Sequence, residues 1–365
     1  MNKSIVFFIS LMALTACTKQ QTTGIHLENL DTTAVAQNDF YQYACGGWMK
    51  NNPIPDEYSR FGSFDKLGLS NLEQVNGLIA DIAAGTHKMG SIPQKIGDVY
   101  NLSMDTARRN QEGITPVLPV LQEIENVTDK AQWSEVLGKA MDFGLWAMYV
   151  DADAMNSSMN ILNEYQAGFA LSQKDYYIDE DEHTKHIREE YVKHVEKMFE
   201  LFGQENAAEK AQTVLRLETR LANAALSNVE LRDPVANYNK MSVEELQKLV
   251  PEVDWKVYFA GLNIAPDSLS VGQVRHLQEA GKMLAEESLE DMKTLFTWQV
   301  IDGSADFLTE EIFMQNFEFY GRILSGRQEP TPLWKRAVAM VNGTLGEAVG
   351  QMYVEKYFPE ENKER

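Results

Sequence analysis

Residues 179–225 read DEDEHTKHIREEYVKHVEKMFELFGQENAAEKAQTVLRLETRLANAA, and this stretch decides the fold class. Its apolar residues recur at helical spacing, and Gly203 divides the pattern in two. The pattern predicts a long helix from about Asp179 to Phe202, ended by Gly203, and a second helix from about Ala207 to Ala225. Most of the chain carries similar patterning, so the protein is predicted to be mainly α.

One segment departs from the helical pattern. Between Trp146 and Ala170 apolar and polar residues alternate around a polar break at Asn156-Ser157-Ser158. Alternation of period two with such a break is typical of a β-hairpin. No linker rich in Pro, Gly or Ser interrupts the chain between about Asp39 and Phe358. The expected architecture is therefore a multi-helix lobe with a small β-hairpin element.

Two signals mark helix starts. Ser242-Val-Glu-Glu245 has the spacing of a capping box, in which Ser and Glu each satisfy a backbone N–H at the helix start. Thr331-Pro332 places a capping residue before a proline at the first helical position. This second signal predicts a tail helix from about Pro332 to Phe358.

Composition and charge exclude several classes of protein. The chain has 365 residues, of which 44% are hydrophobic, so it can bury a sizeable core and is not disordered throughout. Lys and Arg number 33 against 54 Asp and Glu, a formal net charge of -21. Such a chain repels phosphate backbones, so nucleic acid is not expected as a partner. Two cysteines are too few to build a disulfide scaffold.

The N-terminus has the features of a bacterial lipoprotein signal. Residues 1–17 read MNKSIVFFISLMALTAC, with Lys3 before an apolar stretch from Ile5 to Leu14. This stretch is shorter than the ~20 residues that span a bilayer, but it suits the core of a signal peptide. Leu14-Thr15-Ala16-Cys17 matches the lipobox, which implies cleavage before Cys17 and lipid attachment to its thiol. The alternative is an ordinary secretory signal with an incidental cysteine.

This signal predicts the order of segments and the location of the protein. Residues 1–16 are expected to be the lipoprotein signal peptide, residues 17–38 a polar tether, and residues 39–365 the folded domain. Removal of residues 1–16 takes away only Lys3, so the net charge goes from -21 to -22. The protein is expected to be a membrane-anchored bacterial lipoprotein whose folded part lies on the periplasmic or extracellular side.

Residues that could carry chemistry are scarce. None of the six histidines begins a His-Glu-x-x-His motif, which places two zinc ligands on one helical face. His186, Glu190 and His194 follow at intervals of four, but eight residues of helix rise about 12 Å, so the two histidines cannot reach one ion. They are interpreted as a solvated polar face. We therefore predict no catalytic residue and no metal ligand in this chain.

A family resemblance begins at residues 39–67, DFYQYACGGWMKNNPIPDEYSRFGSFDKL. This block resembles the N-terminal signature of the neprilysin-like zinc metalloendopeptidases, which include bacterial oligopeptidases and endothelin-converting enzymes. The chain departs from the family pattern at Ser172-Gln173, where family members commonly have Pro-Asp. The resemblance covers about Asp39 to Arg365. Three later blocks agree with the family in order: Gln94–Tyr100 with Met104-Asp105, Lys174–Tyr177, and Trp334–Arg336 through Val341–Gly343 to Tyr353–Pro359.

The resemblance implies a fold and an activity. In the family, the zinc motifs lie C-terminal to the Tyr353–Pro359 block, so this chain resembles the non-catalytic, mainly helical lobe that faces the zinc lobe across a closed chamber. An intact member would hydrolyse oligopeptides with zinc. This chain alone is expected to bind no zinc and to be inactive, with oligopeptides and the missing C-terminal catalytic lobe as its partners. The alternative is a non-catalytic lipoprotein that binds peptides or a protein.

Two expectations about surfaces follow. Ser59–Asp65 match a family motif whose arginine is implicated in binding the C-terminal carboxylate of the substrate. The resemblance therefore makes Arg60 and Asp65 candidate substrate-binding residues. The alternative is a surface salt bridge between these two residues. A lobe facing a partner should also expose an apolar patch when alone. The tail helix is the candidate for this patch, with Met340, Leu345, Val349, Met352 and Phe358 along it.

Overall fold

The computed structural model describes residues 26–140 and 142–358. The predicted signal peptide and Cys17 lie outside these residues. The chain divides into two compact units, of which the first ends at Pro55 and the second begins at Asp56. No helix within the described ranges combines the length and the apolar character needed to cross a membrane.

The first unit contains η1 (Leu27–Asn29) and α1 (Phe40–Asn51). The Asp31 N–H donates to the carbonyl of Tyr43 at 2.8 Å, which holds the segment around η1 against α1. A Cβ atom on Gly47 would lie 2.4 Å from the carbonyl oxygen of Glu28, so only glycine allows this approach. Part of the stretch expected to be a tether therefore packs on a helix.

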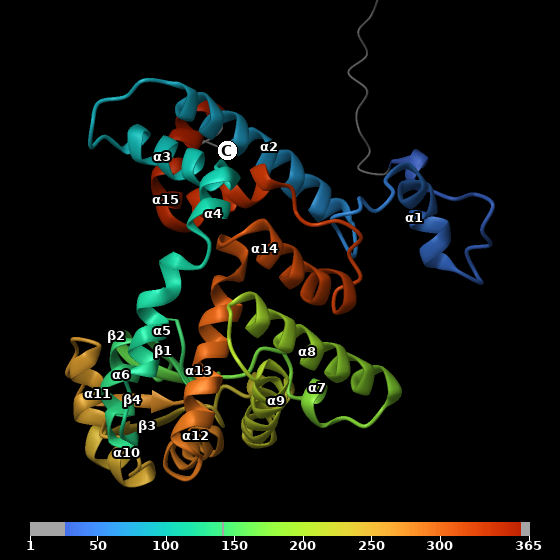
Figure 1. Ribbon diagram of the computed structural model, residues 1–365. Coiled ribbons are helices and arrows are strands. Elements are labelled where there is room, and N and C mark those ends of the chain that lie inside the picture. The colour runs from blue at the N-terminus through green and yellow to red at the C-terminus, as the bar shows by residue number, and fades with distance from the viewer. Residues whose placement is uncertain (1–25, 141, 359–365) are drawn as a thin grey trace, which may run out of the picture. The chain divides into compact units, whose positions relative to one another are not determined.

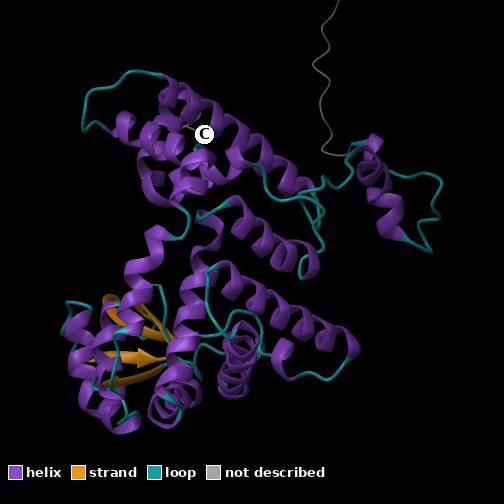
Figure 2. Cartoon of the chain, in the orientation of Figure 1, coloured by secondary structure: helices purple, strands orange, loops and turns teal. Residues whose placement is uncertain are grey.

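The second unit is mostly helical and contains one small sheet (Figures 1 and 2). Its longer helices are α2 (Ser63–Ala84), α3 (Ile92–Met104), α8 (Glu182–Leu201), α9 (Ala207–Ala224), α12 (Val274–Glu286), α13 (Leu289–Ser304) and α15 (Leu333–Tyr357). Its shorter helices are α4 (Thr106–Glu112), α5 (Leu118–Glu125), α6 (Trp133–Lys139), α7 (Asp175–Ile178), α10 (Val243–Leu249), α11 (Trp255–Gly261) and α14 (Glu310–Asn316), followed by the π-helical η6 (Phe317–Ile323). The mainly α fold class is confirmed.

The helix predictions from the sequence are confirmed for α8 and α9. Asp181 caps α8 by accepting from the Thr184 N–H at 3.0 Å, and Gly203 follows the helix with a φ of 69°. A glycine reaches this left-handed conformation without strain, which is why it ends the helix. The Ser242 capping box is also present, because Ser242 and Glu245 each accept from the other's N–H.

The sheet has four strands in the order β1-β2-β4-β3. The predicted hairpin is confirmed as β1 (Trp146–Asp153) and β2 (Asn156–Gln166), which pair antiparallel. The expected break at Asn156-Ser157-Ser158 is wrong, because these residues begin β2 and the turn lies just before them. The sequence pattern did not indicate β3 (Asn239–Ser242) or β4 (Ser268–Val271), which are only four residues long.

Two separate hydrophobic cores stabilise the second unit. The larger core packs the sheet against the helices from α5 to α14 and against η6, and it contains the fully buried Trp133, Trp255 and Trp298. The smaller core joins α2 and α3 to α15, which lie side by side in Figure 1. Its buried residues are Val75, Ile79, Ile96, Val338, Val341 and Val349.

The expectation of an apolar patch along the tail helix is therefore largely wrong. Val349 is buried in the smaller core, and Leu345 and Met352 pack against it. Phe358 stays exposed at the end of the helix. The face of α15 that was expected to await a partner lobe is covered by α2 and α3 of the same chain.

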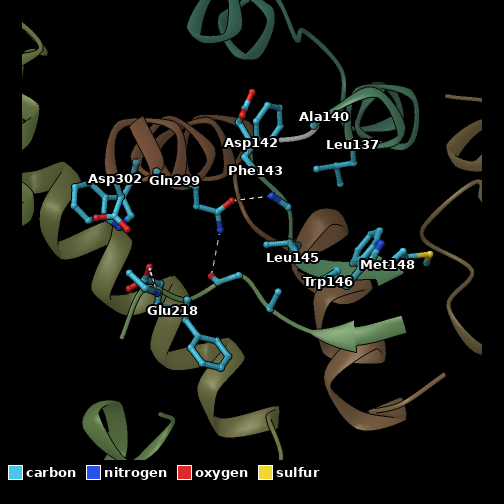
Figure 3. Close-up of a pocket in the computed structure, with 18 of the residues that line it drawn as sticks. Leu137, Ala140, Asp142, Phe143, Leu145, Trp146, Met148, Glu218, Gln299 and Asp302 are labelled. Carbon is cyan, nitrogen blue, oxygen red and sulfur yellow. Dashed lines mark hydrogen bonds between the residues drawn. The ribbon is translucent and has the colours of Figure 1, made fainter. Parts of the chain in front are cut away.

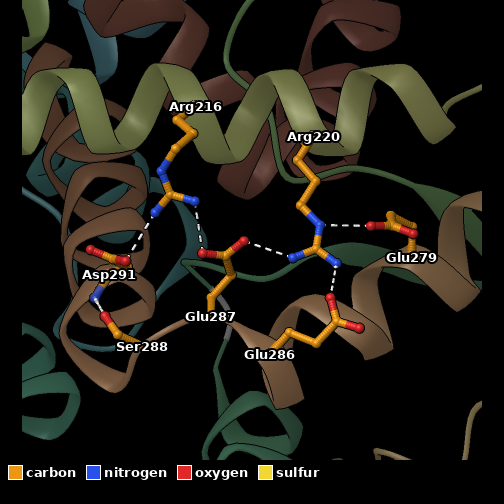
Figure 4. A network of polar contacts seen from close by, with 7 residues as sticks. All are labelled: Arg216, Arg220, Glu279, Glu286, Glu287, Ser288 and Asp291. Atoms are coloured by element: carbon orange, nitrogen blue, oxygen red, sulfur yellow. Dashed lines mark hydrogen bonds and ion pairs between the residues drawn. The ribbon is translucent and has the colours of Figure 1, made fainter.

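An ion-pair network ties α9 to the following helices (Figure 4). Arg220 contacts Glu279 and Glu287 at 2.6 Å each, and Arg216 contacts Glu287 at 2.7 Å. Burial raises the pKa of Glu287, but the two arginines outweigh it and hold the pKa below its usual value. The network fixes α9 beside α12 and the start of α13.

Candidate functional site

The Arg60 cavity has a volume of about 470 Å³ and lies within the second unit. Four segments form it: the stretch before α2, α2 itself, the loop before α15, and α15. Its lining residues are Glu57, Tyr58, Ser59, Arg60, Asp65, Leu72, Ser325, Arg327, Thr331, Lys335 and Ala339. The cavity brings the two predicted substrate-binding residues together with residues that follow about 260 positions later.

Asp65 has a structural task at this cavity. Its Oδ2 accepts from the Gly62 N–H at 2.8 Å, which satisfies a free backbone donor at the start of α2. Arg60 precedes this turn and is exposed to solvent. Within the described residues Arg60 and Asp65 form no ion pair, so the alternative of a surface salt bridge between them is not what the structure contains. The guanidinium of Arg60 lines the cavity instead.

The loop before α15 brings a second guanidinium to the cavity. The N–H groups of Gln328 and Glu329 donate to the Asp56 carbonyl at 2.9 and 3.0 Å, which fastens the loop beside the stretch that carries Arg60. Arg327 donates to Thr331 Oγ1 at 3.4 Å and stacks over the Phe317 ring at 5.5 Å. The sequence predicted that Thr331 caps the tail helix. This prediction is wrong, because α15 begins at Leu333 and has no side-chain cap.

A partly buried ion pair lines the cavity. Lys335 Nζ lies 2.9 Å from Glu57 Oε1, and the two side chains are only 7% and 22% exposed. The hydrogen bond from Lys335 lowers the pKa of Glu57. Burial lowers the pKa of Lys335, but its bonds to Glu57 and Tyr58 outweigh this and raise the pKa. Both groups are therefore charged at neutral pH, and the lysine charge is neutralised in place.

The cavity thus has a basic surplus in an acidic protein. Its three basic residues, Arg60, Arg327 and Lys335, outnumber its two acidic ones, Glu57 and Asp65, and Arg60 and Arg327 form no ion pair within the described residues. A guanidinium is a planar fork of donors that matches the two oxygens of a carboxylate. The arrangement can bind an anion such as a carboxylate, and it contains no nucleophile activated by a base.

The described residues do not fit a zinc site. Across residues 26–140 and 142–358, no group of three or more His, Cys, Asp or Glu side chains could hold a metal ion. The interpretation of His194 as part of a solvated face is wrong: it is buried, stacks on Phe319 at 5.0 Å and lies 3.3 Å from Gln315. Burial lowers the pKa of His194 to about 3, so the ring is neutral. Of the two histidines predicted to lie on that face, His186 and His194, only His186 is exposed.

Sequence reasoning missed Arg327 and Lys335. Lys335 stands in the quoted Trp334–Arg336 block, where a charged residue in an apolar helical pattern is the available signal. Its partner Glu57 lies 278 positions away, and no local pattern connects the two. Cys45 is a half-buried free thiol.

The helical lobe with one small mixed sheet matches the N-terminal region of neprilysin-like peptidases. Residues 36–365 match the family model of peptidase family M13, and the chain belongs to this family. The resemblance seen in the sequence is confirmed.

Known relatives agree with this assignment. The chain is 25% identical over 358 residues to endothelin-converting enzyme 1 of Bos taurus, which covers 93% of this chain and 47% of that protein. The zinc metalloprotease Zmp1 of Mycobacterium tuberculosis, solved with an inhibitor, superposes with a TM-score of 0.87 at 30% identity, covering 92% of this chain and 52% of that one. PepO from Lactobacillus rhamnosis shares the fold at 20% identity, with a TM-score of 0.76 over 90% of this chain and 52% of that one. The chain spans about half the length of these relatives.

Proposed function

We propose that this chain supplies the N-terminal, substrate-binding part of a zinc metalloendopeptidase that hydrolyses oligopeptides. The observation that carries the proposal is the match of residues 36–365 to peptidase family M13. The names of two relatives, an endothelin-converting enzyme and a zinc metalloprotease, agree with cleavage of peptides by a zinc enzyme.

In this proposal the zinc chemistry belongs to residues outside this chain. Zinc in a peptidase polarises the peptide carbonyl and activates water. The described residues do not fit the ion, so their contribution is to bind and orient the peptide. Arg60 is the residue proposed to do so, because it lines a cavity and its guanidinium has no carboxylate partner among the described residues.

We assign to Arg60 the free C-terminal carboxylate of the peptide, with Asp65 positioning the turn that carries the arginine. Loss of a charge-assisted, bidentate contact costs roughly 1.5–3 kcal/mol, or about 10- to 100-fold in kcat/KM. Arg60→Lys should lose much of this as well, because an ammonium cannot reproduce the fork.

The test begins with the DNA downstream of the Arg365 codon. A continuous or adjacent reading frame with His-Glu-x-x-His supplies the catalytic half, and the two parts together should cleave short peptides. Arg60→Met should then impair cleavage of a free-acid peptide and leave its amidated version nearly unaffected. Equal losses on both peptides would refute the role of Arg60. Absence of any such frame would favour the alternative, a peptide-binding lipoprotein without catalysis.

The location of the enzyme is a second part of the proposal. Leu14-Thr15-Ala16-Cys17 supports lipid attachment at Cys17 and a membrane-anchored protein on the periplasmic or extracellular side. Cys17→Ala should move the protein from the membrane fraction to the soluble fraction. If both forms partition identically into the soluble fraction, the anchor does not exist.

A further inference from the structure

A second cavity, here called the carboxyl cavity, has a volume of about 480 Å³ and lies beside the larger core (Figure 3). It opens between the start of β1, the loop after β2, α9 and α13. Five aromatic residues are among those that line it: Phe143, Trp146, Phe169, Tyr258 and Trp298. Two carboxyl side chains, Glu218 from α9 and Asp302 from α13, lie at the same end of it (Figure 3). The proposed peptidase function makes no use of this cavity.

Glu218 is fully buried and well bonded. Its Oε2 accepts from the hydroxyls of Tyr191 at 2.7 Å and Tyr177 at 3.0 Å, and its Oε1 accepts from the Ala170 N–H at 3.1 Å. Burial raises the pKa of Glu218 to about 8. This side chain is held in place by three donors from different segments, so it forms a fixed wall of the cavity.

Asp302 is different, because its bonding is incomplete. Its Oδ1 is shielded from solvent and has no hydrogen-bond partner among the described residues. The hydroxyl of Tyr320 is also buried and lowers the pKa of Asp302 as a hydrogen-bond donor does, but neither this hydroxyl nor Oδ1 has a partner in good hydrogen-bond geometry within the described part of the chain. A buried polar atom without a partner costs free energy unless a ligand or water satisfies it. Asp302 therefore presents an unused acceptor beside an aromatic cavity.

The entrance to the cavity is already shaped without a ligand. Gln299 Oε1 accepts from the Gly144 N–H at 2.9 Å, and Gln299 Nε2 donates to the Gly168 carbonyl at 3.3 Å (Figure 3). Gly168 has a φ of 95°, and a Cβ there would lie 3.0 Å from the Cα of Leu145. One glutamine thus joins the segment before β1 to the segment after β2, so a ligand need not order them.

The aromatic residues and the buried carboxyl groups indicate which kind of ligand fits the carboxyl cavity. Aromatic faces and carboxylates together attract organic cations, and the aromatic area favours a ligand with an aliphatic stem. A divalent metal ion is a poor fit, because no group of three ligating side chains exists among the described residues. The net charge of -21 further concentrates cations near the protein.

We propose that the carboxyl cavity binds an alkylammonium group, with Asp302 as the acceptor of its N–H donors and the aromatic rings as the wall around its stem. The group can come from a free amine or from a lysine side chain of a peptide. The cavity lies within this chain, so binding requires no second lobe and is independent of peptide cleavage.

Binding is linked to a proton. Burial raises the pKa of Asp302 to about 7, so part of the population carries a proton on this carboxyl at neutral pH. The ammonium pairs with the ionised form, and the carboxyl proton leaves to solvent, so charge is conserved. Affinity therefore rises as the pH rises from about 6 to about 8. Glu218, Asp142 and Tyr258 also line the cavity, and Tyr177, Tyr191, Tyr320 and Asp306 are the titratable groups that act on Glu218 or Asp302 from behind its lining.

The test is calorimetry on the whole chain, with tryptophan fluorescence as a second signal because Trp146 and Trp298 line the cavity. The probes are butylammonium, Nα-acetyl-lysine methylamide and its neutral norleucine analogue. We expect both ammonium probes to saturate one site and the norleucine analogue not to bind. Titrations at pH 7 in two buffers of different ionisation enthalpy should show proton release.

Asp302→Asn keeps the shape of the side chain and should weaken binding at least 10-fold. Asp267→Asn is the matched control, because Asp267 is exposed and lies outside the cavity, and it should leave binding unchanged. Binding of the lysine probe alone would identify a peptide side chain as the source of the ammonium group. Equal binding of the norleucine analogue, an unchanged affinity of Asp302→Asn, or no binding of either ammonium probe would overturn the proposal.

The wild-type pH profile keeps the proposal testable if Asp302→Asn does not fold. An affinity for butylammonium that is independent of pH between 6 and 8 would contradict a role for Asp302. Failure of these binding tests leaves the proposed peptidase function untouched, since that function depends on Arg60 and a separate catalytic half.

Discussion

The two cavities of this protein place charge in opposite ways. The Arg60 cavity contains exposed or half-buried cations, and its one buried charge, Lys335, is neutralised by Glu57 at 2.9 Å. The carboxyl cavity contains acids that burial has shifted toward their neutral forms, with pKa values of about 8 for Glu218 and about 7 for Asp302. The side chains of the first cavity stay charged because they are paired or solvated. Burial in the second cavity favours the neutral forms of its two acids. Substitution of an exposed cation such as Arg60 should therefore act mainly on ligand binding, and substitution of a buried, fully bonded acid such as Glu218 mainly on stability.

The largest effect is expected for Glu218→Ala. The change leaves the hydroxyls of Tyr177 and Tyr191 and the Ala170 N–H without their acceptor, and it also opens a void. We expect the free energy of unfolding to fall by about 3–5 kcal/mol. Urea unfolding measures it, with Glu218→Gln as the control that keeps an acceptor and should lose less. A loss below about 1 kcal/mol for Glu218→Ala would show that the acid does not organise the core.

The second prediction concerns pH. Glu218, Asp302 and Glu164 all have pKa values raised by burial, to about 8, 7 and 8. Their folded forms bind protons more tightly than the unfolded chain, so their contribution to stability is present at low pH and is lost as the pH rises toward 8. Burial lowers the pKa of His194 and of the buried His276 to about 3 and about 4, so these two rings act in the opposite sense, but only below about pH 6.5, the usual histidine value.

Between pH 6.5 and 8 these three buried acids therefore determine how the free energy of unfolding changes with pH. We expect the free energy of unfolding to fall by about 2–4 kcal/mol over this range. Urea unfolding at several pH values measures the slope, and Glu218→Gln should reduce it, since Asp302 and Glu164 still contribute. A flat profile for the wild-type protein would mean that these acids are ionised in the fold.

A smaller loss is expected when the buried ion pair of the Arg60 cavity is broken. Lys335→Met leaves the Glu57 carboxylate half-buried without its partner and should cost about 1–3 kcal/mol. The double variant with Glu57→Gln should recover part of this loss. Lys139→Met breaks the exposed pair with Glu135 and is the matched control, for which we expect less than about 0.5 kcal/mol. Equal costs at the two positions would contradict the importance of burial.

The smallest effect on stability is expected for Arg60→Met. Arg60 is exposed and forms no ion pair among the described residues, so the free energy of unfolding should change by less than about 0.5 kcal/mol. Thermal or urea unfolding checks it. A loss above about 1 kcal/mol would show that Arg60 supports the fold, and its proposed role at the substrate would then have no separate basis.

Local patterns predicted the parts of the fold that depend on local physics. α8 and α9 follow from helical periodicity and from the left-handed Gly203, and the hairpin follows from alternation. The pattern could not reveal β3 and β4, because four-residue strands are stabilised by distant partners. It also placed His194 on a polar face, although the aromatic rings that bury it come from η6, more than 100 positions later.

The candidate site shows the same division. The motif at Ser59–Asp65 named Arg60, and the structure places Arg60 at a cavity. Arg327 and Lys335 reach that cavity through tertiary packing alone, and the buried acids Glu218 and Asp302 belong to no local motif. Their pKa values arise from burial, which a sequence does not display.

The smaller core also has a consequence for protein synthesis. Its first apolar residues, from Val75 to Ile96, lie on α2 and α3, and Val349 of α15 completes it. The ribosome must add about 250 residues after Ile96 before the contacts of Val349 can form. At about 5–20 residues per second, this is a wait of roughly 13–50 s. During that time the nascent chain presents an uncovered apolar helix pair, which makes this pair the expected point of contact for a chaperone.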